Sequence, residues 1–205
     1  MSAPPFPPPD APKKKPGLAW PVRVIVGIVG LIAVVSGVNQ VRHGIGEIKG
    51  SSLDWQRRAV AGLSVELPGA PVKEDIQPAA EAAPRVKLME MHGVKTNGAL
   101  IKITHVAYTD AAKVSMDAEL EGGKEALSAS PGIDKLKMSV VETQVQNGPA
   151  KTMSADYTLP NFGEQHSESL YFSRGQESWV VVVMGVPAVV KEIAQRLLPS
   201  VQIAP

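Results

Sequence analysis

Four histidines and a few spaced carboxylates are the side chains of this 205-residue chain that could do chemistry. None of the histidines, His43, His92, His105 and His166, lies at the HxH, HxxxH or HExxH spacing of a zinc site. The chain has no cysteine, which excludes thiolate catalysis and thiolate metal ligands. It also lacks a GxSxG, P-loop or dinucleotide-binding motif. The sequence therefore predicts a protein that is not an enzyme, with no catalytic, cofactor-binding or metal-binding residues and no cofactor.

Three positions come nearest to a chemical site. His166 and Glu168 share one face of a predicted strand and are a candidate pair of metal ligands, although a structural role is the commoner outcome. Asp117 and Glu121 lie one helical turn apart, where two carboxylates form a solvated face unless a cleft buries them. In the predicted strand 99–108, His105 points to the same face as Ile101, Ile103 and Ala107. We therefore expect it to lie in the core or at the edge of the sheet.

The stretch Val22–Val41 predicts that the chain crosses a membrane. Its central residues are uncharged and almost all Val, Ile, Leu, Ala or Gly. As a helix it would span about 30 Å, the thickness of a hydrocarbon core. We place the transmembrane helix at residues 20–42, with interface anchors at Trp20, Arg23 and Arg42. A buried core helix is the weaker alternative.

The basic cluster Lys13–Lys15 orients this helix with its amino end in the cytoplasm. The larger domain that follows is then periplasmic or otherwise extracytoplasmic, at a bacterial inner membrane. A cleaved signal peptide, cut after the small residues Val35 and Gly37, is the rival interpretation. Within the helix, small residues form a strip that either packs against another helix or is ordinary glycine content: Gly30, Ala33 and Gly37.

Composition divides the chain into a tail, the anchor, a joint and one domain. Residues 1–19 are rich in proline and predict a disordered cytoplasmic tail, with or without a proline-reading partner. Residues 43–61 predict a juxtamembrane hinge and a short helix through Trp55–Val60, with Ser51 as N-cap and Gly62 just past its end. Residues 62–205 form the extracytoplasmic domain, which is long enough for its own core.

Within this domain the hydrophobic pattern predicts an α+β fold. Alternating or continuous apolar runs predict strands at 63–67, 85–92, 99–108, 135–140, 152–159, 165–173, 179–184 and 200–203. Helical patterns cover 113–129, where Gly122-Gly123 favours either one weakened helix or two short ones, and the segment from Pro187 to Pro199. We expect an irregular connection over 70–83.

Three local segments carry a resemblance to a known family: Ser64–Pro71, Leu170-Tyr171-Phe172 leading into Trp179–Met184, and Leu198–Val201. Together with the element order, they resemble the PsbP-like sandwich superfamily, which includes the bacterial DcrB-like envelope proteins. The resemblance covers residues 62–203. It implies an antiparallel sheet flanked by helices, arranged as an α/β/α sandwich, and a non-enzymatic accessory domain that stabilises or regulates a larger assembly. It transfers no functional residue, because no matching motif is present.

Charge and architecture together favour an accessory protein of the membrane. Residues 1–43 hold five basic residues and one acidic residue, a charge of +4, and the remainder is −3. An acidic external domain is unsuited to nucleic acid. We therefore expect a membrane-anchored subunit that docks on a membrane protein complex or another envelope protein, with self-association left open. The alternative is a domain that binds a small ligand or lipid, and an anchored hydrolase comes third.

Overall fold

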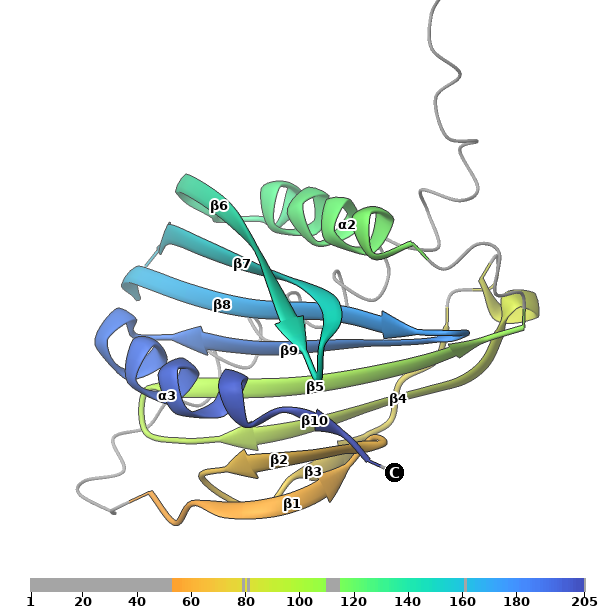
Figure 1. The fold of residues 1–205 in the computed structure, drawn as a ribbon. Coiled ribbons are helices and arrows are strands. Elements are labelled where there is room, and N and C mark those ends of the chain that lie inside the picture. The colour runs from red at the N-terminus through yellow and green to blue at the C-terminus, as the bar shows by residue number, and fades with distance from the viewer. Residues whose placement is uncertain (1–52, 79, 81, 110–114, 161, 205) are drawn as a thin grey trace, which may run out of the picture.

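The computed structural model describes residues 53–204 apart from residues 79, 81, 110–114 and 161. These residues form a β-rich sandwich with two helices (Figure 1). The large sheet has seven antiparallel strands in the order β3 (Val72–Glu74), β4 (Val86–Lys95), β5 (Ala99–Tyr108), β9 (Glu177–Gly185), β8 (Gly163–Arg174), β7 (Gly148–Leu159) and β6 (Asp134–Val145). A small sheet contains β1 (Gln56–Val60), β2 (Leu63–Leu67) and β10 (Gln202–Ile203), and the helices are α2 (Met116–Ala129) and α3 (Pro187–Ser200).

Each face of the large sheet is covered by a different layer. On one side, which we call the α3 face, α3 and the small sheet pack on Ile101, Val181 and Leu170. On the other side, the α2 face, Leu120 and Leu127 of α2 pack with side chains of β7, β8 and β9. The strands alternate between the two cores because successive side chains point to opposite faces. The α+β class and the antiparallel sheet flanked by helices are therefore confirmed.

The central strands follow the predicted pattern closely. Strands β2 and β5 occupy the predicted ranges 63–67 and 99–108. In β9 the apolar run is buried on both faces, because α2 side chains meet one face and α3 side chains the other. Trp179 of this strand donates its indole Nε1–H to the carbonyl oxygen of Ala61 at 2.8 Å, which fixes the small sheet to the large one.

The predicted helix at Trp55–Val60 is wrong, because residues 56–60 form strand β1. This strand pairs with β2 through a two-residue turn in which Ala61 and Gly62 both have positive φ, 51° and 73°. That turn is the tight hairpin connection that matches the twist of paired strands. The sandwich domain consequently begins at or before Gln56, rather than at residue 62.

Two further differences and one alternative that the sequence left open concern single elements. The connection predicted as irregular contains the short edge strand β3 and one 3-10 turn, Ala83–Arg85. Residues 116–129 form one helix rather than two, and Ser115 caps it by accepting a hydrogen bond from the backbone amide of Ala118. Helix α3 includes Pro199 and ends at Ser200.

Candidate functional site

Strands β7 and β8 present a row of polar side chains on the α3 face. On β7 every second residue is polar, whereas the residues between them, such as Met153 and Ala155, are buried on the α2 face. The register pairs Ser154 with Glu168 and Asp156 with His166. This part of the sheet is therefore not covered by the core, and its polar groups are available for recognition.

These four side chains form one hydrogen-bonded chain, which we call the His166 row. The hydroxyl of Ser154 donates to Glu168 Oε2 at 2.7 Å. The His166 ring lies between two carboxylates, with Nε2 2.9 Å from Glu168 Oε1 and Nδ1 2.7 Å from Asp156 Oδ1. Because His166 is buried and Asp156 is exposed, the row runs from the sheet interior out to solvent.

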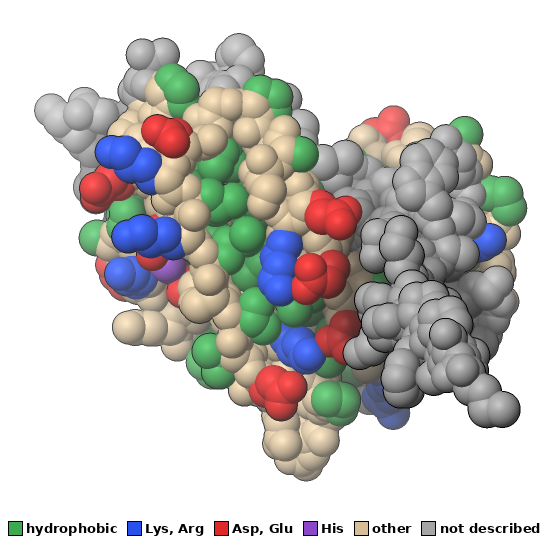
Figure 2. Space-filling view, turned by 90° about the horizontal axis from the view of Figure 1, so that it is seen from above, with side chains coloured by type: hydrophobic (Ala, Val, Ile, Leu, Met, Phe, Trp, Pro, Cys, Tyr) green, Lys and Arg blue, Asp and Glu red, His purple; other side chains and the backbone are tan. Residues whose placement is uncertain are grey.

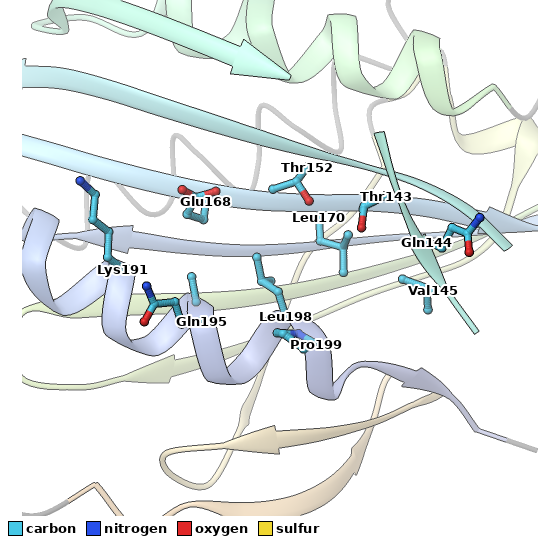
Figure 3. A pocket seen from close by; sticks show the side chains of 11 residues that line it. Thr143, Gln144, Val145, Thr152, Glu168, Leu170, Lys191, Gln195, Leu198 and Pro199 are labelled. Atoms are coloured by element: carbon cyan, nitrogen blue, oxygen red, sulfur yellow. The ribbon is translucent and has the colours of Figure 1, made fainter. Parts of the chain in front are cut away.

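A hollow of about 650 Å³ lies beside this row, between α3 and the strands (Figure 3). Lys191 and Leu198 extend from α3 towards Glu168 and Leu170 of β8 (Figure 3). The opposite wall comes from β6, whose end bends over the α3 face (Figure 1). The lining mixes hydroxyl, amide, charged and apolar groups from Thr143, Gln144, Val145, Thr152, Glu168, Leu170, Lys191, Ala194, Gln195, Leu198 and Pro199.

A second hollow, of about 680 Å³, meets the first at Lys191. It extends to Pro187 at the start of α3 and is lined by Asp156 of the His166 row and by Lys137 of β6. We call the two hollows together the trough. It runs along the 14 residues of α3, which rise about 20 Å. The trough is long enough for a short extended segment of polypeptide and wide enough for a small ligand.

The His166 row does not have the geometry of a hydrolase. A nucleophilic serine needs its hydroxyl bonded to the base that removes its proton. Here Ser154 bonds to Glu168, and this carboxylate separates it from His166. Among the described residues, no group of three or more His, Asp or Glu side chains is placed to hold a metal ion, so the candidate pairing of His166 and Glu168 gains no support as a metal site.

A second histidine cluster surrounds Glu90 of β4. Lys73 Nζ lies 3.3 Å from Glu90 Oε2, His92 Nε2 lies 3.6 Å from the same oxygen, and His105 Nδ1 lies 3.5 Å from Oε1. Burial raises the pKa of Glu90, but hydrogen bonds from Lys73 and the two histidines outweigh it and leave this pKa below its usual value. The His105 ring stacks on Trp179 with centroids 4.9 Å apart, as expected for a core histidine. Because hydrogen bonds favour ionised Glu90, we interpret this cluster as structural.

The carboxylates of α2 have different environments. Asp117 and Glu121 are exposed and pair with Lys151 and Lys124, which confirms the predicted solvated face. Glu119, which the pattern did not single out, is buried and accepts a hydrogen bond from Tyr108 at 3.1 Å. Burial raises the pKa of Glu119 to about 7. It faces the core behind α2 and not the trough.

The residues of the predicted tail, membrane span and start of the hinge lie outside the described part of the chain. They are the span Val22–Val41, the anchors Trp20, Arg23 and Arg42, the packing strip Gly30, Ala33 and Gly37, the tail 1–19 and His43. Among the described residues, no helix is long and apolar enough to cross a membrane.

The described residues form a sandwich whose fold is similar to that of a solved PsbP protein. The solution structure of cyanobacterial PsbP (CyanoP) from Synechocystis sp. PCC 6803 is similar, with a TM-score of 0.51 and 12% sequence identity over 79% of this chain and 99% of that chain. At this identity the similarity shows a shared fold.

Two further solved structures are similar at lower scores. LpqN of Mycobacterium tuberculosis, described as involved in cell envelope biogenesis, gives a TM-score of 0.41 at 13% identity over 67% of this chain and 86% of that one. The protein PA94 of Pseudomonas aeruginosa, described as a putative regulator of unknown function, gives 0.37 at 8% identity over 69% and 89%. No protein-family model and no curated protein sequence matches the chain.

Sequence reasoning found part of the site and missed the rest. It placed His166 and Glu168 on one strand face, but not Asp156 or Ser154, which join them through the pairing of β7 with β8. The available signal was the strict alternation of polar residues along 152–158, which marks a strand face outside the core. Nothing local in the sequence indicates that α3 forms one wall of the trough.

Proposed function

We propose that the chain is a single-pass, membrane-anchored accessory protein of the bacterial envelope, and that its sandwich domain binds another envelope protein through the trough. The trough is the single observation that carries this proposal. The trough is open and runs along the whole of α3. Its lining combines apolar, polar and charged side chains, as protein–protein contact surfaces do. The proposal includes no catalytic step, because the one serine in the His166 row is bonded to a carboxylate.

The location rests on the sequence before the domain. The stretch Val22–Val41 would hold the chain in the inner membrane, with Trp20, Arg23 and Arg42 at the interfaces. The basic cluster Lys13–Lys15 would keep the amino end in the cytoplasm and leave the sandwich on the outer side. The fold shared with cyanobacterial PsbP supports an accessory domain, since the sequence resemblance to that superfamily implies this role.

A specific observation also favours the alternative, a domain that binds a small ligand or lipid. The hollow beside the His166 row has an apolar side, formed by Leu170, Val145 and Leu198, and its volume suits a drug-sized molecule. Native mass spectrometry of the protein released from gentle detergent distinguishes the two. A stoichiometric bound small molecule supports the alternative, and a bare chain with a protein partner supports the main proposal.

Filling the trough tests the main proposal. Gln195 lines the trough on α3, whereas Glu192 is exposed on the same helix and does not line it. We expect the partner to co-migrate with wild type and with Glu192→Trp after gentle detergent extraction, sizing and mass spectrometry. We expect Gln195→Trp to reduce the recovered partner at least tenfold, because an indole occupies the space. Equal recovery with both variants would refute binding in the trough.

A further inference from the structure

Strand β6 ends the large sheet with an open edge. It has twelve residues, it pairs on one side with β7, and no other described strand pairs with its outer side. Nearly all of its residues are exposed. Three large hydrophobic side chains gather in the middle of this edge, with 37%, 37% and 64% of their surface exposed: Met138, Val140 and Val141. An unpaired edge with exposed apolar side chains is a template for another strand.

Only the start of β6 has features that discourage pairing with another strand. At its start the pairing with β7 shifts register between Asp134 and Lys137, and Lys135 has a positive φ of 52°. Such an irregularity and nearby lysines discourage strand addition. The segment from Met138 to Thr143 has neither a proline nor a lysine. Figure 2, which looks down on the side where β6 and α2 lie, shows hydrophobic side chains exposed between flanking charged ones.

We propose that β6 pairs antiparallel with β6 of a second copy of this chain, with Ser139 opposite its own counterpart across a twofold axis. This interface goes beyond the trough and the accessory role and does not depend on them, although its strength in a membrane rests on the proposed anchor. In this register Met138 faces the second copy's Val140, and Val140 faces its Met138, so four apolar side chains meet on the α2 face. On the α3 face Val141 lies opposite the aliphatic stem of Lys137.

Neighbouring registers are less favourable. A twofold axis perpendicular to the sheet places the α2 faces of both copies on the same side of the joined sheet. The pairing can therefore shift only by two residues, because a shift by one residue would place side chains of opposite faces against each other. With Val140 on the axis, Glu142 lies opposite Met138. With Met138 on the axis, Glu142 lies opposite Asp134 and the two acids repel each other. The register centred on Ser139 pairs Met138 with Val140 twice on the α2 face, with Glu142 opposite Leu136, and it places no two acidic side chains opposite each other.

The symmetry also suits two chains held in one membrane. The small sheet containing β1 packs on the α3 face of each copy. Because the twofold axis preserves the faces, both β1 strands lie on the same side of the joined sheet. Pairing of about five residues of β6 from each copy buries little surface area, so the dimer is weak in dilute solution. Tethering of both copies to one bilayer raises their effective concentration and favours pairing.

Disulfide formation between two copies that each carry one introduced cysteine reports this register directly, because the chain has no cysteine of its own. In the proposed dimer the two residues at 139 have Cα atoms about 5 Å apart, which a disulfide can bridge. The two residues at 141 are about 14 Å apart and cannot be bridged. We expect full-length Ser139→Cys in proteoliposomes to give at least fivefold more disulfide dimer than Val141→Cys under mild oxidation. Equal yields, or stronger cross-linking of Val140→Cys, would overturn this interface.

A charge substitution gives a second and independent test. Val140→Lys places two lysines next to the axis, where they repel each other, and should lower the dimer fraction at least fivefold, measured by energy transfer between labelled copies of the full-length protein in proteoliposomes. Val72→Lys is the matched control, because Val72 is exposed on β3 at the opposite edge of the same sheet. Circular dichroism checks that both variants fold. A dimer fraction that Val140→Lys leaves unchanged would contradict the proposal, whatever the outcome of the partner experiment at Gln195.

Discussion

Glu119 is the residue whose protonation should set the pH dependence of stability. Burial raises the pKa of Glu119 to about 7, above the ordinary value of 4.5 for a glutamate. The folded state therefore holds a proton that the unfolded state loses between about pH 4.5 and 7, and stability falls as pH rises through that window. The loss amounts to about 3 kcal/mol at most.

Glu119→Gln removes this dependence because the amide stays neutral. We expect the variant to be more stable than wild type at pH 8 and similar to it at pH 4.5, measured by urea unfolding of the full chain. The hydrogen bond from Tyr108 has an acceptor in both cases. If wild type and variant changed in parallel between pH 4.5 and pH 8, the buried carboxylate would not be the cause.

A single glycine also shows the limits of local prediction. Gly62 was interpreted as the residue that ends a helix, and its positive φ agrees with that role as well as with a hairpin turn. The polar residues Gln56, Arg57 and Arg58 have good helix propensity, so local signals favoured a helix. Pairing with β2 decided the outcome, because Val60 and Leu63 are buried together in the core.

At the scale of elements, α2 contains a glycine that packing requires. The pair Gly122-Gly123 weakens a helix in isolation, and the sequence left open whether the helix breaks there. The helix is continuous, and a β-carbon built on Gly123 would overlap the hydroxyl of Tyr171 on β8. Gly123 therefore allows the close approach of α2 to the sheet.

Gly123→Ala should destabilise the protein by about 1–3 kcal/mol, because overpacking outweighs the gain in helix propensity. The measurement is chemical unfolding followed by circular dichroism. The matched partner is Tyr171→Phe, which removes the overlapping oxygen, so the double variant should recover part of the loss. A Gly123→Ala protein that is more stable than wild type would show that α2 and β8 are not in this contact.

Most elements could be predicted from periodicity, but not all. Strands β2, β5 and β9 and helix α3 have strong alternating, continuous or helical apolar patterns, and their positions agree closely with the sequence. Strand β3 has only three residues, in a segment rich in proline and alanine. It forms because it pairs antiparallel with β4. Edge strands of this kind depend on a distant partner, which local patterns do not encode.

At the scale of the whole molecule, the trough is the feature that sequence could least predict. It needs α3 on the sheet, the β6–β7 hairpin bent over the same face and the register that joins Asp156 to His166. Each of these is a contact between residues far apart in the chain. The resemblance found in the sequence did imply the antiparallel sheet flanked by helices, and the strand pairing confirms that part.

The most direct test of the central claim is site-specific photo-cross-linking in intact membranes. A photoreactive phenylalanine at position 195 lies in the trough, and the same residue at 192 lies on α3 outside it. We predict that position 195 forms one discrete adduct with another envelope protein and that position 192 forms at least tenfold less of it. Equal adducts at both positions, or no protein adduct at position 195, would contradict the account of the trough as a partner-binding site.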